Sequence, residues 1–300
     1  MVLRRLGFLV AVLVFIGLAA CSTSGTPHGA LPSGLPSPPP PAPERCLSPD
    51  ETPAPGDAVC FPGGELDQEL EITTSGTADA PVYYRGNGTV VPGIRVKADN
   101  VVVEGFVSKG AKSTGIVANG ENVTVRDNEI TQVEYDGDDV DAIRFFGDGA
   151  QILNNRVYDL EANDIEDSHV DCIQTFAVEL PGSSNVVIQG NRCEGIRAQC
   201  LMAEGPNDEG GSGEGVSRNW LFDGNYCDAH ADAQSVALED IQDVTISNNE
   251  MVGEGNKAFA LGMNSTGVVV RDNRIGPDYG REVGFDDPSA AQGYQGPPAE

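Results

Sequence analysis

Acidic, basic and histidine side chains recur as i, i+2 pairs at four places in the middle of this chain. The pairs are Asp139 with Asp141, His169 with Asp171, Arg197 with Gln199, and Asp232 with Gln234. Residues two apart on a β-strand project from the same face, so each pair is expected to point toward one surface. Carboxylates, histidine and arginine gathered at one surface are the groups that acid–base chemistry on a polar substrate uses.

The strands that carry these pairs belong to an internal repeat. Six segments share alternating apolar residues followed by a polar pair that ends in asparagine, at Asn128, Asn155, Asn191, Asn225, Asn249 and Asn273. A period of two predicts β-strands, and a phase kept from copy to copy predicts that they stack. We expect the asparagines to form a ladder at a turn, where stacked amides hydrogen-bond to one another.

A second strand precedes each of the last five copies. These strands begin at Asp141, Asp171, Gln199, Gln234 and Lys257. Two strand columns with a period near ~24 residues predict an all-β fold, a single-stranded parallel β-helix of about eight coils that spans residues 46–276.

The residues added to the repeat are clustered. Residues 131–140 and 158–170 lengthen the turn that enters two adjacent coils, and residues 177–184 and 204–218 lengthen the turn that leaves two adjacent coils. Both sets flank the column that carries the i, i+2 pairs. Because inserted loops on a rigid scaffold are common places for a site, we predict a groove with these pairs on its floor.

Asp141 and Asp171 are expected on adjacent coils with parallel side chains. Like charges held this close raise one pKa and leave the other carboxylate ionised, as acid–base hydrolysis of a glycosidic bond requires. We therefore predict a glycoside hydrolase with Asp141 and Asp171 as acid and base, assisted by His169. The predicted substrate-binding residues are Asp139, Arg144, Asp167, Gln174, Arg197, Gln199, His230, Asp232 and Gln234.

Elimination on a uronic-acid polymer is a second interpretation. Arg144, Arg197 or Lys257 would neutralise the uronate, and His169 would act as the base. An acidic groove repels such a substrate unless Ca²⁺ bridges the two, and oxygen ligands suit that ion.

Two further interpretations stay open. Asp139 and Asp141 are the candidate calcium ligands, and His169 with Asp171 and Asp139 is a candidate transition-metal site. The protein would otherwise be a non-catalytic glycan-binding or scaffold protein, although its few aromatic residues disfavour sugar platforms.

Two stretches, residues 75–86 and 99–106, resemble the opening of pectin-lyase-like β-helix proteins, which include chondroitinase-B-like and pectate-lyase-like enzymes. The resemblance implies a right-handed helix, and the family contains lyases, hydrolases, epimerases and non-catalytic proteins. Asp171-Cys172-Ile173 is similar to the Asp-Cys-Ile of the polygalacturonase active-site strand. Val170 stands where that family doubles the aspartate, and its Arg-Ile-Lys segment is absent, so this activity is in doubt.

Six of the seven cysteines remain once Cys21 is set aside as a lipidation site. Cys46 and Cys60 bracket a short loop and are expected to pair. The columns place Cys193 beside Cys227 and Cys172 beside Cys200 on neighbouring coils. Neighbouring strands are about 4.8 Å apart, which is within the disulfide range. Each of these two pairs is therefore predicted as a disulfide or as a stack of buried thiols.

The front of the chain predicts secretion. Arg4 and Arg5 precede an apolar run over 6–20, as in a signal peptide. Leu18-Ala19-Ala20-Cys21 resembles the bacterial lipobox, which implies a lipidated Cys21 and an extracytoplasmic protein anchored to the membrane or envelope surface. Residues 21–45 then form a proline-rich linker, predicted to be a semi-extended spacer, and residues 277–300 are a tail or a cap.

Charge limits the partners. The formal net charge is −28, whereas nucleic-acid binding needs lysine and arginine to neutralise phosphates. We expect a monomer that binds a polysaccharide or oligosaccharide and not nucleic acid, and that contacts a membrane only through the lipid anchor.

Overall fold

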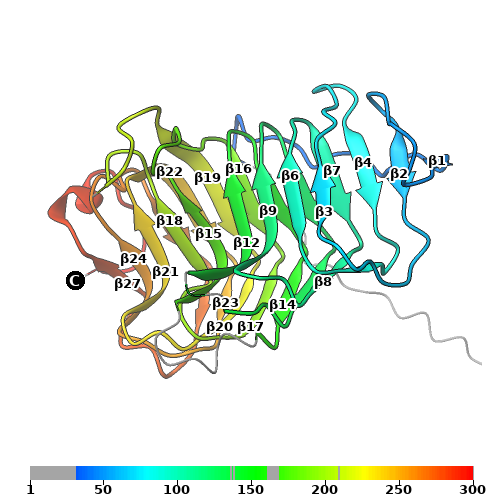
Figure 1. Cartoon of the computed structure of the whole chain (residues 1–300). Helices are drawn as coiled ribbons and strands as arrows, with labels where there is room; N and C mark the ends of the chain where they lie inside the picture. Colours follow the sequence, from blue (N-terminus) through cyan, green and yellow to red (C-terminus); the bar gives the residue numbers. More distant parts are fainter. Residues whose placement is uncertain (1–31, 136, 138, 161–168, 209, 300) are drawn as a thin grey trace, which may run out of the picture. The chain divides into compact units, whose positions relative to one another are not determined.

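Three strands per coil, rather than the two predicted, build the walls of this protein (Figure 1). The computed structural model describes residues 32–135, 137, 139–160, 169–208 and 210–299. They lie in the compact unit Leu31–Glu300. The predicted signal peptide, the lipidation site Cys21 and the candidate Asp167 lie outside the described residues.

The ten-stranded sheet A forms one wall. Its strands, in spatial order, are β1 (Cys46–Leu47), β2 (Ala58–Cys60), β4 (Val82–Arg85), β7 (Val101–Glu104), β10 (Thr124–Arg126), β13 (Gln151–Leu153), β16 (Val186–Gln189), β19 (Ser217–Asp223), β22 (Ile241–Ser247) and β25 (Val269–Arg271).

The nine-stranded sheet C forms the wall that carries the candidate site. It contains β3 (Leu70–Ile72), β6 (Ile94–Lys97), β9 (Thr114–Asn119), β12 (Val140–Phe146), β15 (Val170–Phe176), β18 (Leu201–Glu204), β21 (Gln234–Glu239), β24 (Lys257–Leu261) and β27 (Val283–Phe285).

The eight-stranded sheet B joins these two walls. It contains β5 (Val90–Val91), β8 (Val107–Lys109), β11 (Glu129–Thr131), β14 (Arg156–Tyr158), β17 (Arg192–Ile196), β20 (Tyr226–Ala229), β23 (Glu250–Met251) and β26 (Arg274–Ile275). Each coil runs from sheet C to sheet A to sheet B, and the pairings between these strands are parallel.

The register of sheet C confirms the predicted columns. Asp141 pairs with Asp171 across β12 and β15, and Gln234 pairs with Lys257 across β21 and β24. Because side chains alternate between the two faces of a strand, this register brings the polar residues of successive coils together on the outer face of sheet C.

The predicted asparagine ladder is present at the turn from sheet A to sheet B. Asn155 Nδ2 donates to Asn191 Oδ1 at 3.0 Å, and Asn191 Nδ2 donates to Asn225 Oδ1 at 3.1 Å. Each of these side chains also donates to a main-chain carbonyl of the preceding coil. These buried amides satisfy one another, so the turn stays closed without exposing polar groups to water.

The N-terminal disulfide is as predicted, and the two interior ones are not. Cys46 is bonded to Cys60, but the other two bonds are Cys172–Cys193 and Cys200–Cys227. The stacking prediction itself is confirmed, since Cys193 and Cys227 are in register on neighbouring coils. The predicted pairs are wrong because side chains stacked along a column run parallel, whereas cysteines on sheets C and B of one coil point at each other across the interior.

The C-terminal segment is a cap rather than a free tail. After β27 the chain forms the short 3₁₀ helix η2 (Pro288–Ala291), whose Ala290 is buried against the last coil. The Phe285 and Tyr294 rings meet edge to face at 5.1 Å. In the part of the chain that the structure describes, no helix is long and apolar enough to cross a membrane.

Residues of the predicted spacer lie along the outer face of sheet A instead of extending away from it. Leu35 and Ala42 each pack against apolar side chains of that sheet. We use the term strap for residues 34–42.

Candidate active site

A cleft of about 520 Å³ opens on the outer face of sheet C, beside the turn that enters β12. Its lining residues are Ser113, Tyr135, Gly137, Asp139, Arg144, His169 and Phe176. The enlarged turns predicted from the repeat are confirmed, since long connections precede β12 and follow β15 and β18. Three of the predicted site residues, Asp139, Arg144 and His169, therefore share one cleft.

Arg144 is held at the cleft by Asp141. Its Nε donates to Asp141 Oδ2 at 2.8 Å, and its Nη2 contacts the same oxygen. The Arg144 side chain is 18 % exposed, whereas that of Asp141 is fully buried. The guanidinium carbon also lies 5.2 Å from the centre of the Phe176 ring. The arginine is thus fixed from both sides, and its carboxylate partner lies beneath it.

On the next coil, His169 is held in the same way by Asp171. Its Nδ1 lies 3.3 Å from Asp171 Oδ2, and its side chain is 45 % exposed while that of Asp171 is fully buried. The other carboxylate oxygen, Asp171 Oδ1, accepts a hydrogen bond from the Gln199 main-chain N–H at 2.7 Å. Asp171 therefore joins an exposed imidazole to the backbone of the following strand.

Burial dominates the proton affinity of both aspartates. It raises the pKa of Asp141 from 3.8 to about 7, against the opposing effect of Arg144. Burial, and after it the negative charge of Asp141, raises the pKa of Asp171 well above its usual value. The sequence predicted one raised pKa beside an ionised carboxylate, whereas both pKa values are raised here, because burial rather than the mutual repulsion of the pair is the largest cause.

Three buried acceptor oxygens at this place, Asp141 Oδ1, Gln174 Oε1 and Gln199 Oε1, have no hydrogen bond to any described residue. A fourth, Asp171 Oδ2, has only the 3.3 Å contact with His169 Nδ1. Unpaired buried acceptors are costly, and protonation of a carboxyl supplies a donor. The arrangement therefore fits a pair of aspartates that carries at least one proton.

The remaining predicted residues divide into two groups. Gln174 and Gln199 are buried, Gln199 contacts Asp171 through its main-chain N–H, and Arg197 is half-buried at the turn before Gln199. His230, Asp232 and Gln234 are not part of the cleft lining.

His230 instead lies at the end of β20. Its Nε2 is 3.2 Å from Asp228, and its Nδ1 is 3.3 Å from Glu254. The prediction that His230 lies at the groove rested on the spacing of the strands alone. That spacing does not determine in which direction the side chain of a turn residue points.

Sequence reasoning missed Tyr135, Ser113 and Phe176, which come from the turns and strand ends around the cleft. It also missed Glu204 and Glu239, which are in register at the far ends of β18 and β21. Burial, and then Asp208, raises the pKa of Glu239 to about 7. Their signal was the shared column position, five residues after Gln199 and Gln234 respectively.

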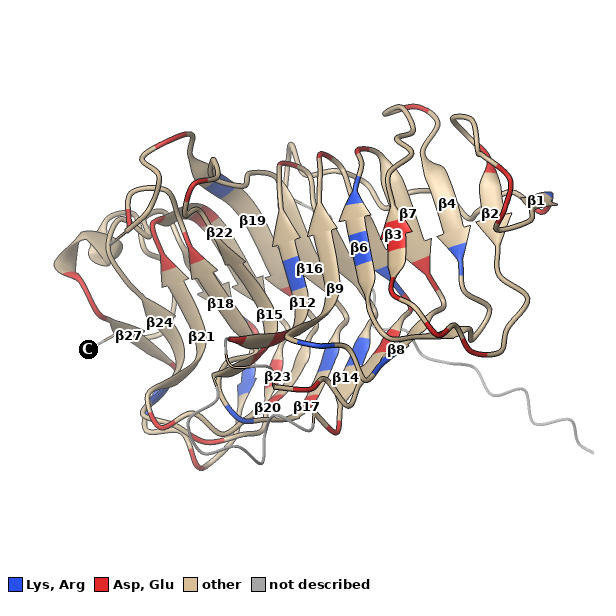
Figure 2. Ribbon diagram, viewed as in Figure 1, with Lys and Arg blue, Asp and Glu red and all other residues tan. Residues whose placement is uncertain are grey.

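Segments coloured for Asp and Glu are more frequent along the ribbon than segments coloured for Lys and Arg (Figure 2). Even so, within the described ranges no three His, Cys, Asp or Glu residues are grouped so that they could hold a metal ion. Asp139 and Asp141, the candidate calcium ligands, differ in setting, since Asp139 is exposed and Asp141 is buried against Arg144.

Residues 92–275 match the family described as right handed beta helix region. This match covers more than half of the chain, so the chain belongs to that family. The expectation of a right-handed parallel β-helix is confirmed. None of the curated protein sequences matches this chain.

Several solved structures are similar to it. A PL6 family alginate lyase, AlyGC, aligns with a TM-score of 0.50 at 14 % identity over 78 % of this chain and 32 % of the lyase. An alginate lyase from Paenibacillus sp. str. FPU-7 aligns with a TM-score of 0.37 at 15 % identity over 81 % of this chain and 92 % of that one. The catalytic domain of a GH87 alpha-1,3-glucanase aligns with a TM-score of 0.33 at 10 % identity, over 87 % and 70 % of the two chains.

At 14 % identity the likeness to AlyGC shows the fold alone. The chain spans about a third of the length of AlyGC.

Proposed function

We propose that this protein cleaves a polysaccharide in the sheet C cleft by β-elimination at a uronic-acid unit. One observation carries the proposal: the cleft presents a histidine and an arginine, and each is held from below by a fully buried carboxylate. An exposed base and a partly exposed cation in one cleft are the minimum that elimination from a uronate needs.

Arg144 would bind the uronate carboxylate and withdraw charge from the neighbouring C5–H bond. A guanidinium suits this task because its planar fork matches a carboxylate. The pKa of Asp141, near 7, matters here, since a partly protonated partner cancels only part of the positive charge of Arg144. The cleft thus keeps a usable cation in a strongly acidic protein.

His169 would remove the C5 proton. As the C5–H bond breaks, its electron pair forms the C4–C5 double bond, and the bond from C4 to the glycosidic oxygen breaks. The departing oxygen needs a proton, and the Tyr135 phenol in the cleft lining is a suitable donor. Asp171 and Gln199 act behind His169 as positioning residues, because they fix the imidazole without touching the sugar.

Hydrolysis of an uncharged glycan is the second candidate, favoured by the raised pKa values of Asp141 and Asp171. Such carboxyls hold a proton at neutral pH and could deliver it to a leaving group. Glycoside hydrolases, however, place both carboxyls beside the scissile bond. Here both are fully buried and absent from the cleft lining, so elimination is the better fit.

The test is a panel of uronic-acid polymers and neutral glucans incubated with the purified protein. Elimination produces reducing ends together with ultraviolet absorbance from the new double bond. Hydrolysis produces reducing ends alone and would overturn the elimination mechanism. Binding without any cleavage across the panel would overturn catalysis altogether and favour a glycan-binding protein.

His169→Ala tests the site itself. Loss of a general base is expected to lower the cleavage rate at least ~100-fold. His230→Ala is the matched control, because that histidine is equally exposed but lies in a separate acidic cluster. Equal activity of the two variants would show that the cleft is not the active site.

A further inference from the structure

The outer face of sheet A is apolar in two patches, although an outer face normally meets water. Tyr83, Val102 and Ala58 form one patch, and Leu153, Val187 and Leu221 form the other. Both are separate from the core that fills the solenoid. Each patch is covered by a single residue of the strap, Ala42 over the first and Leu35 over the second.

Between these patches, side chains of sheet A donate hydrogen bonds to carbonyls of the strap. Tyr83 Oη donates to Pro40 O at 3.3 Å, Arg126 Nη1 to Pro39 O at 2.8 Å and Arg126 Nη2 to Pro40 O at 3.2 Å. One coil further along, Gln151 Nε2 donates to Ser37 O at 3.4 Å. Prolines have no N–H group, so a proline-rich segment can be recognised through its main chain only by donors of this kind.

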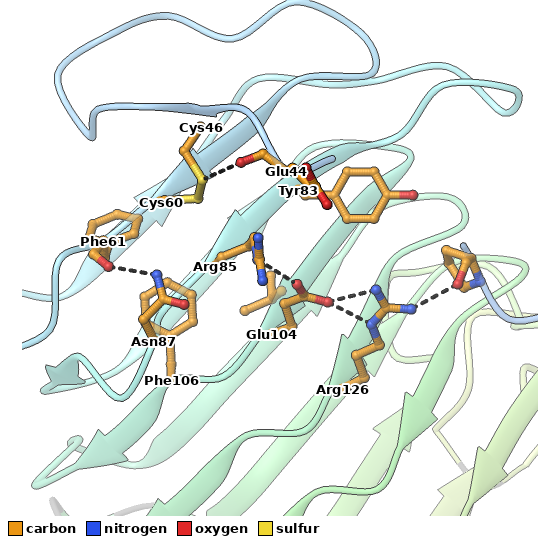
Figure 3. Close-up of polar contacts among 12 residues, drawn as sticks. Glu44, Cys46, Cys60, Phe61, Tyr83, Arg85, Asn87, Glu104, Phe106 and Arg126 are labelled. Carbon is orange, nitrogen blue, oxygen red and sulfur yellow. Dashed lines mark hydrogen bonds and ion pairs between the residues drawn. A yellow bond between two sulfur atoms is a disulfide. The ribbon is translucent and has the colours of Figure 1, made fainter. Parts of the chain in front are cut away.

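The central donor, Arg126, is also held by charged residues of sheet A itself. Arg126 Nε donates to Glu104 at 2.8 Å, and Arg85 forms an ion pair with the other oxygen of Glu104 at 3.1 Å (Figure 3). The Arg126 side chain is only 12 % exposed. This chain of three charges crosses three coils and points one guanidinium at the strap carbonyls, so little conformational freedom is lost on contact.

The length of the strap also agrees with the distance that it spans across the strands of sheet A. Ala42 contacts the β2–β4–β7 patch, and Gly34 lies against Asn219 of β19. From β4 to β19 is five strand steps, or roughly 24 Å at about 4.8 Å per step. Eight residues in a polyproline II helix rise about 25 Å at about 3.1 Å each. A segment in that conformation would therefore cross the strands with its contacts in step, up to the turn at Gly34, whose φ of 93° ends it.

We propose that the outer face of sheet A is a recognition site for a polyproline II segment, occupied here by residues 34–42 of the same chain. Complementary patches, oriented donors and matched spacing hold the strap, independently of its covalent link at residue 45. Its role is to place the start of the strap beside β19, the eighth of the ten strands of sheet A, and not at the first coil. This proposal does not depend on the proposed enzymatic function.

The experiment uses the full chain with a protease recognition sequence inserted between Arg45 and Cys46, cut after folding. The fragment that contains the strap is expected to stay bound through size-exclusion chromatography. A labelled peptide of residues 32–45 should then exchange into the cut protein, as followed by fluorescence anisotropy. Immediate loss of the fragment together with no peptide binding would overturn the proposal.

Variants test the assigned contacts. Arg126→Ala should weaken peptide binding on the order of tenfold, as expected for loss of charge-assisted hydrogen bonds. Arg156→Ala, an exposed arginine of sheet B, is the matched control and should leave binding unchanged. A scrambled peptide of the same composition should bind at least roughly tenfold more weakly than the native one. Equal binding by the Arg126 variant or by the scrambled peptide would overturn the assignment.

Discussion

The buried carboxyls of Asp141 and Asp171 have different interaction partners. Arg144 offsets the charge of Asp141, whereas Asp171 has one main-chain N–H and a half-exposed histidine. For Asp141 the rise in pKa from 3.8 to about 7 corresponds to about 4 kcal/mol that disfavours the ionised form in the folded state. Taking up a proton avoids this cost, so Asp141 is expected to titrate near pH 7.

This raised pKa predicts a pH-dependent stability. The unfolded chain ionises near pH 4, while the folded Asp141 keeps its proton up to about pH 7. The folded state therefore binds more protons between these values, and its free energy of unfolding falls as pH rises through that window. The slope is at most about 1.4 kcal/mol per pH unit for each such group.

Urea unfolding of the native protein and of Asp141→Asn, from pH 4 to above pH 7, measures this slope. The variant is expected to show a flatter dependence, because its amide does not titrate. Asp278→Asn, at an exposed position, is the control and should keep the native slope. Identical slopes in all three proteins would mean that Asp141 is ionised in the folded state across the window.

At the scale of the element, β15 carries both the chemistry and its support. Asp171 faces the cleft side, and the next residue, Cys172, points inward to a disulfide with Cys193 of β17. The following coil repeats the pattern, since Gln199 donates to Asp171 and Cys200 is bonded to Cys227 of β20. Two covalent bonds thus lie directly behind the residues that hold His169.

Removal of one interior bond is expected to lower both stability and activity. Cys172→Ala with Cys193→Ala frees a segment of 21 residues in the unfolded chain, which costs about 3 kcal/mol of unfolding free energy. The cleavage rate should fall as well, because β15 loses its inner support. Cys46→Ala with Cys60→Ala, far from the cleft, should cost similar stability and leave the cleavage rate unchanged. Denaturant unfolding and the cleavage assay measure the two effects.

Elements that follow a strict alternation could be predicted from sequence, and those that break it could not. The columns of sheets A and C follow from the alternation. Sheet B was missed because strands such as β5 and β23 have two residues, too few to show a period. The contact of the strap with sheet A was also missed. Three consecutive apolar residues, Val101, Val102 and Val103, are typical of a strand that is covered on both faces, and all three are buried.

The candidate site could likewise be predicted only where its strands keep a strict alternation. The i, i+2 pairs located the cleft correctly at Asp139 and His169. The covering of Asp141 by Arg144 was not predictable, because Ala142 and Ile143 both pack into the core. Two consecutive inward residues shift the alternation by one, so residues three apart meet on the same face. Only the backbone reveals such a bend.

At the scale of the whole molecule, a solenoid needs a cover at each end because every coil buries its faces against its neighbours. The C-terminal cap contributes Ala290 to the core, and the hydroxyl of its buried Tyr279 lies 2.7 Å from that of Ser235. Its Asp286 also forms an ion pair with Lys257, the last member of the site column. The cap is thus part of the fold rather than an appendage.

Truncation after Gly276 is expected to expose the apolar end of the last coil and cause self-association. Light scattering and binding of a hydrophobic dye should both increase relative to the full chain. Replacement of Lys257 by methionine removes only the ion pair and is the control, which should remain monodisperse. A truncated protein that stays monomeric and binds no dye would show that the last coil needs no cover.

The interior disulfides have one more consequence, for the order in which the molecule opens. Each bond closes most of one coil into a covalent ring, and the two rings are stacked in the middle of the array. Coils at either end can peel away one at a time, but unravelling that starts from an end must stop at a ring that cannot be unwound. The solenoid is therefore expected to open as two separate ends on either side of these two closed coils. The cleft lies at the N-terminal border of the closed coils, with Phe176 inside the first ring and His169 just before it.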